Sequence, residues 1–149
     1  MSAAAQIRAA REAAGLSQAE LAARAGTSQP AVSAYESGAR RPAKLTVARL
    51  LAAAAPRPSI ILARHRDTII DLARRNKAHN VRVFGSIARG EDTPDSDIDL
   101  LVAFRRGASL LDQAGLVLDL EEALGRRVDV VSDRAVKPGS TILMDAVPI

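Results

Sequence analysis

The chain has 149 residues, which is enough for one ordinary domain or two small ones. It has no cysteine, which excludes a disulfide framework and a thiolate metal site, and no apolar run approaches the roughly eighteen residues of a membrane span. Residues 1–58 hold eight Arg and Lys against three Glu, whereas residues 59–149 hold thirteen against fourteen acids. We therefore expect a cytoplasmic protein whose first third meets a polyanion; the alternative is that the basic surplus serves solubility alone.

The first 55 residues carry a regular series of helix starts and stops. Apolar spacing and glycines predict helices over residues 6–14, 18–25, 29–37 and 43–54. Ser17 with Glu20 forms a capping box for the second helix, and Pro30 lies in the first turn of the third. Two short helices joined by a glycine-containing turn make a helix-turn-helix, whose second helix enters the major groove of DNA.

Residues 1–55 resemble the Xre/Cro family of repressors. The matching positions are Leu16-Ser17-Gln18, Glu20-Leu21-Ala22, Gly26-Thr27-Ser28, Val32-Ser33, Tyr35-Glu36, Gly38 and Pro42. The resemblance implies an ion pair between Arg11 and Glu36. It also implies DNA contacts, to bases from Gln18, Gln29 and Ser33 and to phosphates from Arg40, Arg41 and Lys44. The alternative for this segment is a four-helix interaction module that binds no DNA.

Two prolines, Pro56 and Pro58, interrupt the helical pattern and favour an extended spacer. We therefore predict a first domain over residues 1–55, a linker over 56–59 and a second domain over 60–149. The second domain is predicted to begin with one long helix from Ser59 to about Ala78, followed by a turn at His79-Asn80.

The second domain is organised around residues 81–104, which read as strand, turn, loop and strand. Gly85 permits a sharp turn and close approach of a ligand to the main chain. Ser86 is expected to cap a short helix from Ile87 to Arg89, and a helix start of this kind binds phosphate. Asp97 and Asp99 are two residues apart on the second strand, so their side chains share one face, roughly 7 Å apart.

Two carboxylates beside a phosphate cradle suit Mg²⁺ that carries a nucleoside triphosphate. Further along the chain, residues 110–124 predict an amphipathic helix with Leu110, Leu111, Leu118, Leu120 and Leu124 on its apolar side. Residues 127–132 predict a third strand that carries Asp129, and a short closing helix and a tail follow. The alternative is that Asp-x-Asp and Asp129 are merely exposed strand residues.

The combination Gly85-Ser86-x-Ala88-Arg89-Gly90, five loop residues and Ser96-Asp97-x-Asp99-Leu100 is specific. It resembles the minimal nucleotidyltransferases (MNT) of the DNA polymerase beta superfamily, over roughly residues 60–149. The resemblance implies that Asp129 is a third carboxylate, as metal ligand or as base. Arg89 lies at the end of the Gly85 turn, where two roles are open: to clamp the triphosphate or to face the acceptor. We expect two domains, an all-α helix-turn-helix of four to five helices and an α/β nucleotidyltransferase domain with a small mixed sheet.

Members of the MNT family are commonly antitoxins paired with HEPN toxins. The resemblance therefore implies a bifunctional antitoxin that uses Mg²⁺ and ATP to transfer AMP to a hydroxyl of a HEPN toxin and binds operator DNA. It would act as a homodimer or as a hetero-oligomer with the toxin. Two alternatives remain, a non-catalytic DNA-binding antitoxin that keeps a degraded transferase as scaffold, and a transferase that acts on a small molecule.

Overall fold

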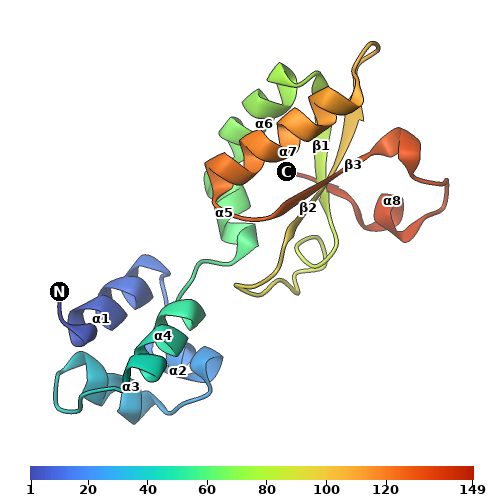
Figure 1. Cartoon of the computed structure of the whole chain (residues 1–149). Coiled ribbons are helices and arrows are strands. Elements are labelled where there is room, and N and C mark those ends of the chain that lie inside the picture. Colours follow the sequence, from blue (N-terminus) through green and yellow to red (C-terminus); the bar gives the residue numbers. More distant parts are fainter. The chain divides into compact units, whose positions relative to one another are not determined.

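The computed structural model describes residues 1–149, and the chain divides into two compact units, Met1–Pro56 and Arg57–Ile149 (Figure 1). The first unit contains only helices, and the second combines helices with a mixed sheet, as the sequence predicted.

Four helices make up the first unit: α1 Ala3–Ala13, α2 Gln18–Ala25, α3 Gln29–Glu36 and α4 Lys44–Ala53. The side chains of Ser2, Ser17 and Ser28 accept hydrogen bonds from the N–H groups that the first turns of α1, α2 and α3 leave free. The capping box between Ser17 and Glu20 is present, so the local signals read from the sequence place these helix starts correctly.

The apolar faces of the four helices meet in one core that contains Ile7, Leu16, Leu21, Val32, Tyr35 and Leu50. Helix α4 leaves Leu45 and Ala48 exposed. Instead α4 turns Val47 and Leu50 toward this core, in agreement with the spacing of one helical face.

The second unit contains α5 Pro58–Arg64, α6 Arg66–Arg75, β1 Ala78–Phe84, β2 Ile98–Phe104, α7 Leu110–Leu124, β3 Val128–Ser132, the short 3₁₀ turn η1 Asp133–Ala135, α8 Thr141–Asp145 and β4 Val147–Pro148. The strands lie in the order β3-β2-β1-β4; β2 and β3 run parallel, and the other two pairs are antiparallel. No helix alone is long and apolar enough to cross a membrane, although α4 and α5 taken as a pair have the length and composition of a span.

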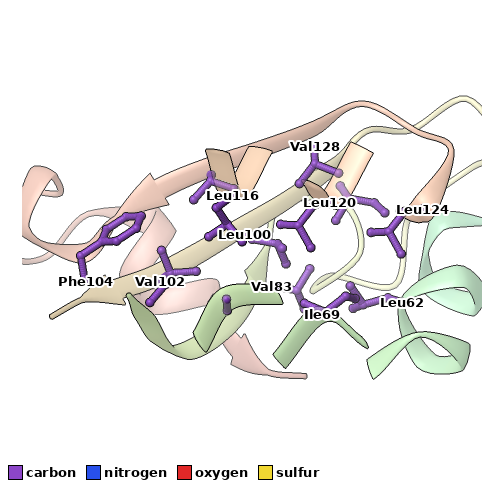
Figure 2. Close-up of a cluster of buried hydrophobic side chains, with 14 residues drawn as sticks. Leu62, Ile69, Val83, Leu100, Val102, Phe104, Leu116, Leu120, Leu124 and Val128 are labelled. Atoms are coloured by element: carbon purple, nitrogen blue, oxygen red, sulfur yellow. The ribbon is translucent and has the colours of Figure 1, made fainter. Parts of the chain in front are cut away.

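Helices α6 and α7 lie side by side on one face of the sheet, and α8 lies on the other side (Figure 1). Between the sheet and these two helices is the core of the second unit, where Val83, Leu100, Val102 and Val128 from the strands meet Ile69, Leu116 and Leu120 from the helices (Figure 2). The alternate residues of β2, Asp99, Leu101 and Ala103, belong to the opposite face, because successive side chains of a strand point to opposite sides.

Three predictions about this unit are wrong in detail. The long helix breaks at His65, which has φ −110° and ψ 17°, so α5 and α6 are separate, and α5 begins inside the predicted linker. His79 and Asn80 are not a turn before β1 but part of it: Asn80 has φ 49°, and the pairing with β2 shifts register between His79 and Arg82. The predicted C-terminal tail forms β4, which pairs with β1.

The apolar side of α7 is also placed differently. Leu116, Leu120 and Leu124 are buried at intervals of four residues, whereas Leu110, Leu111 and Leu118 are 83%, 83% and 67% exposed. Leucines surround this helix on several sides, so their spacing did not identify which stripe would meet the sheet.

Candidate active site

Strand register brings the three predicted aspartates to one edge and one face of the sheet. In the pairing of β1 with β2, Phe84 lies opposite Asp99, and in the pairing of β2 with β3, Asp99 lies opposite Asp129. Residues paired directly across neighbouring strands project to the same face. Asp97 comes one residue before β2 and two before Asp99, so it belongs to that face as well. Asp97 and Asp129 are exposed and Asp99 is half-buried.

Gly85 follows β1 directly and lies against the carboxylate of Asp99. Its φ is +71°, a conformation that side chains rarely adopt. A Cβ atom added at Gly85 would lie 2.4 Å from Oδ2 of Asp99, which is closer than any real contact. The missing side chain therefore leaves the space in which the Asp99 carboxylate sits, and the sequence requires glycine here for two reasons.

Residues 85–90 form consecutive turns, not the short helix expected from Ile87 to Arg89. The N–H of Arg89 donates to the carbonyl of Gly85 (3.2 Å), and the N–H of Glu91 donates to the carbonyl of Ser86 (2.8 Å). The Ser86 hydroxyl caps no N–H group. The main-chain N–H groups of Ser86, Ile87 and Ala88 donate no hydrogen bond within the protein, and successive free N–H groups of a turn can hold an anion.

The pKa of Asp99 is raised above its ordinary value of 3.8. Burial is the main cause, the charges of Asp129 and Asp97 raise the pKa further, and Arg89 opposes them. The three carboxylates thus repel one another through a partly desolvated medium. A cation placed among them would remove this repulsion, because it favours the charged form of every carboxylate.

The three aspartates suit Mg²⁺, because this ion prefers oxygen ligands and their carboxylates lie at one edge of the sheet. The absence of a side chain at Gly85 leaves room for the carboxylate of Asp99. As they stand, no three acidic or histidine side chains of the protein converge to the distances at which they would hold a metal ion. Carboxylates that repel one another close to ligand distances only around a cation, so metal binding and side-chain movement are coupled here.

Arg89 lies at the rim of this face and is held by two acids. Its Nε lies 2.9 Å from Oε2 of Glu91, and its Nη1 lies 3.8 Å from Oδ2 of Asp145 in α8. These ion pairs connect the turn after β1 with α8. The guanidinium is about half exposed and remains accessible to an anionic ligand.

Two residues that the sequence analysis did not single out position the loop between the turn and β2. Arg126 donates from Nη2 to the carbonyl of Pro94 and from Nη1 to the carbonyl of Ser96 (2.9 Å), the residue directly before Asp97. Asp92 is buried and accepts a hydrogen bond from the N–H of Ser59 in the first turn of α5 (2.9 Å). Both contacts join residues 30 or more positions apart, so no local pattern in the sequence announces them.

In the first unit, the predicted ion pair between Arg11 and Glu36 is confirmed. Nε and Nη2 of Arg11 lie 2.6 and 3.0 Å from the two carboxylate oxygens of Glu36, and Nη1 donates to the carbonyl of Leu16. The two side chains are 13% and 1% exposed. The pKa of Glu36 is lowered, chiefly by the hydrogen bond from Arg11.

The residues predicted to contact DNA fall into an ordered group and a free group. Gln18 donates to Glu36 (3.0 Å) and accepts from Gln29 (3.0 Å), so the glutamine at the start of α3 is oriented through the one at the start of α2. Arg40 stacks over the ring of Tyr35 at 5.6 Å. The remaining residues make no side-chain contact that fixes them: Ser33 is half-buried, and Arg41 and Lys44 are exposed.

Matches to known protein families agree with the division of the chain into two units. The model described as "Nucleotidyltransferase domain" matches residues 66–143, and the model described as "Helix-turn-helix" matches residues 7–58. The first match contains the Gly85 turn and all three aspartates, and the second contains most of α1 and all of α2 to α4.

Similar proteins cover between half and two thirds of this chain. "Putative protein adenylyltransferase MJ0435" of Methanocaldococcus jannaschii is 41% identical over 83 residues, which are 54% of this chain and 89% of that protein. "Protein adenylyltransferase MntA" of Thermococcus cleftensis is 42% identical over 79 residues, covering 52% of this chain and 80% of that protein. The solved "Structure of putative minimal nucleotidyltransferase" is 48% identical with a TM-score of 0.56, and covers 61% of this chain and 95% of that one.

Proposed function

Because the chain belongs to the nucleotidyltransferase domain family, we propose that it transfers AMP from ATP to a hydroxyl of a partner protein. The chain is a nucleotidyltransferase that resembles protein adenylyltransferases and carries a helix-turn-helix DNA-binding domain. The observation that carries the proposal is the alignment of Asp99 with Asp129 across β2 and β3, with the Asp99 carboxylate against Gly85.

We assign the roles as follows. Asp97, Asp99 and Asp129 would hold Mg²⁺, which supplies charge neutralisation for the triphosphate and orients pyrophosphate as the leaving group. The free N–H groups after Gly85 would hold phosphate oxygens, with Arg89 at the rim. The acceptor oxygen attacks the α-phosphorus, the bond to pyrophosphate breaks, and the hydroxyl proton passes to a base. Asp129, which is exposed, serves as the third ligand or as that base.

The family resemblance of residues 60–149 supports a HEPN toxin as the acceptor, so that transfer of AMP inactivates it. The helix-turn-helix supports a second activity, repression of the operon that encodes the pair. Eight basic residues against three acids in residues 1–58 give this unit the charge that binding to operator DNA requires.

The test is to incubate the purified chain with labelled ATP, Mg²⁺ and the protein encoded beside it, and to measure the mass of that protein. A gain of one AMP is expected with the natural chain and none with Asp97→Asn, because a ligand of the cation is lost. Asp95→Asn, which changes an exposed acid of the same loop, is the matched control and should transfer AMP normally. If neither the natural chain nor the control transfers AMP, and Asp97→Asn neutralises the toxin as well as the natural chain does, the chain acts as a non-catalytic scaffold.

A further inference from the structure

The face of the sheet that carries the aspartates continues to a cavity at the other end of β2. Arg82 lies opposite Leu101, and His79 lies opposite Ala103, so all four residues share the face of Asp99. Ala103 is four residues from Asp99, or about 13 Å along an extended strand. A cavity of about 500 Å³ opens there, and its lining consists of His79, Arg82, Ala103, Phe104, Asp133, Arg134 and Leu143.

The two arginines of this cavity have no partner within the protein. Arg82 is half-buried, forms neither an ion pair nor a side-chain hydrogen bond, and has a completely buried Nε without an acceptor. Arg134, which is exposed, forms no ion pair either, and Asp133 is the one carboxylate in the lining. The lining therefore holds two arginines and one acid, and the cavity keeps a net positive charge.

A buried donor without an acceptor costs free energy, and the cost is larger for a charged group. Arg57, at the start of this unit, also has a buried Nε without an acceptor, whereas Arg89 has two acids and Arg126 has two carbonyl groups. An oxyanion would supply what Arg82 lacks, because a carboxylate or a phosphate group accepts two parallel hydrogen bonds from a guanidinium.

We propose that this cavity, which we name the Arg82 cavity, binds an oxyanion of the acceptor protein. This inference rests on the proposed function, because the acceptor must lie across the same sheet face to bring its hydroxyl to the aspartates. A carboxylate or phosphate group in the Arg82 cavity would anchor the acceptor about 7–13 Å along the strand from Asp99, between the levels of Leu101 and Ala103. Arg82 and Arg134 are then positioning residues that determine which acceptor is modified, and they take no part in the chemical step.

The first test measures anion binding by the full chain without any transfer. Inorganic phosphate is titrated while the Nε–H signal of Arg82 is followed by NMR, and acetate is then used as a competitor. We expect phosphate to shift this signal, and the shift to persist when a non-hydrolysable ATP analogue and Mg²⁺ saturate the aspartates. Competition by acetate identifies an acidic side chain as a sufficient source of the oxyanion, and its failure identifies a phosphorylated group.

The second test uses variants. Arg82→Gln should weaken phosphate binding about tenfold, which corresponds to one charge-assisted hydrogen bond, whereas Arg82→Lys keeps the charge and should retain most of it. Arg75→Gln, an exposed arginine at the end of α6, is the control and should bind as the natural chain does. With the acceptor, Arg82→Gln should raise the KM for the acceptor and leave the KM for ATP unchanged.

The inference is overturned if phosphate does not shift the Arg82 signal, or if the ATP analogue displaces phosphate, since the cavity would then belong to the nucleotide site. Failure of the proposed function gives a different result. In that case phosphate still binds at Arg82 and its binding is still weakened in Arg82→Gln, but no protein receives AMP from ATP.

Discussion

The contact between Asp99 and Gly85 is the tightest constraint at the candidate site. Asp99 is half-buried, stands between two other aspartates, and occupies the space that a side chain at position 85 would fill. This arrangement lowers the stability of the folded chain when no ligand is bound, because burial and like charges both disfavour an ionised carboxylate. Two predictions follow from this single residue and its neighbour.

We expect Asp99→Asn to raise the free energy of unfolding at neutral pH in the absence of Mg²⁺. The folded-state pKa of Asp99 is raised, so its ionised form destabilises the folded chain above that pKa, and the penalty disappears as the pH falls toward 3.8. Thermal unfolding measured across this pH range should therefore show a gain that is largest at neutral pH. Asp95→Asn should show no such gain, and an equal gain at every pH would contradict the explanation.

We expect Gly85→Ala to abolish nucleotide binding, and Gly90→Ala to leave it intact. Both glycines have φ near +70°, so alanine should cost each about 1–2 kcal/mol of stability. Only at Gly85 would the new Cβ meet Asp99, since nothing lies within 4 Å of the Cβ position at Gly90. Calorimetric titration with an ATP analogue and Mg²⁺ distinguishes the two variants. Similar affinities for both would show that the close contact at Asp99 is unimportant.

At the scale of elements, single side chains connect parts of the chain that are distant in sequence. Glu36 in α3 receives hydrogen bonds from Arg11 in α1 and Gln18 in α2, and Arg126 after α7 holds the loop that leads into β2. In both places a charged group lies among carbonyl or carboxylate oxygens, and the removal of one partner weakens what holds the other. Without Arg11, the Glu36 carboxylate keeps the hydrogen bond from Gln18 and an ion pair with Arg8 at 3.7 Å.

Removal of one partner of the buried Arg11–Glu36 pair should therefore destabilise the first unit strongly. We expect Arg11→Met to lower the free energy of unfolding by about 3–5 kcal/mol, because Glu36 stays buried and charged. The double change Arg11→Met with Glu36→Leu should cost less. Denaturant unfolding of the three variants gives the coupling energy, and equal small losses would show that the pair contributes little.

The pair also predicts a pH dependence. Because the pKa of Glu36 is lowered in the folded state, the stability that it contributes is present above 4.5 and is lost as the pH falls through the folded pKa. In the double variant this acid-dependent loss should be reduced, which chemical unfolding at neutral and acid pH can measure.

Arg126→Met should lower transfer activity without unfolding the chain. The loop at Pro94–Ser96 would lose two hydrogen bonds, and Asp97, which follows directly, would lose its fixed position. The neighbouring Arg127 is exposed and its side chain makes no hydrogen bond, so Arg127→Met is the matched control. Initial rates of AMP transfer should fall only in the first variant, and an equal effect of both would exclude positioning by Arg126.

At the scale of the molecule, the two units have separate cores, and the predicted DNA residues and aspartates lie in different units. The full chain should therefore lose the two activities independently. Asp97→Asn should leave operator binding unchanged. Arg41→Ala should weaken binding to every DNA sequence and reduce the salt slope by about one unit, whereas Gln29→Ala should relax base preference. Footprinting upstream of the chain's own gene at several salt concentrations measures these effects, and no footprint with the natural chain would exclude repression.

Local interactions account for what could be read from the sequence. Helices α2 and α7 have the predicted bounds, because Ser17 and Asp112 accept hydrogen bonds from main-chain N–H groups three residues away and Gly26 and Gly125 end the helices. Asp97 and Asp99 could be assigned to one face because the alternation of a strand is equally local. The mixed sheet and the presence of a helix-turn-helix followed from the same kinds of pattern, supported by family resemblance.

Interactions between distant segments account for the rest. The pairing of β4 with β1, the hold of Arg126 on the loop before Asp97 and the choice of Leu116 over Leu118 on α7 all depend on a surface or a carbonyl group that folding brings close. Asp99 lies opposite Asp129 only because the parallel strands β2 and β3, which α7 separates in the sequence, pair in this register. Composition and spacing specify which groups are available, but only the packed chain specifies which of them meet.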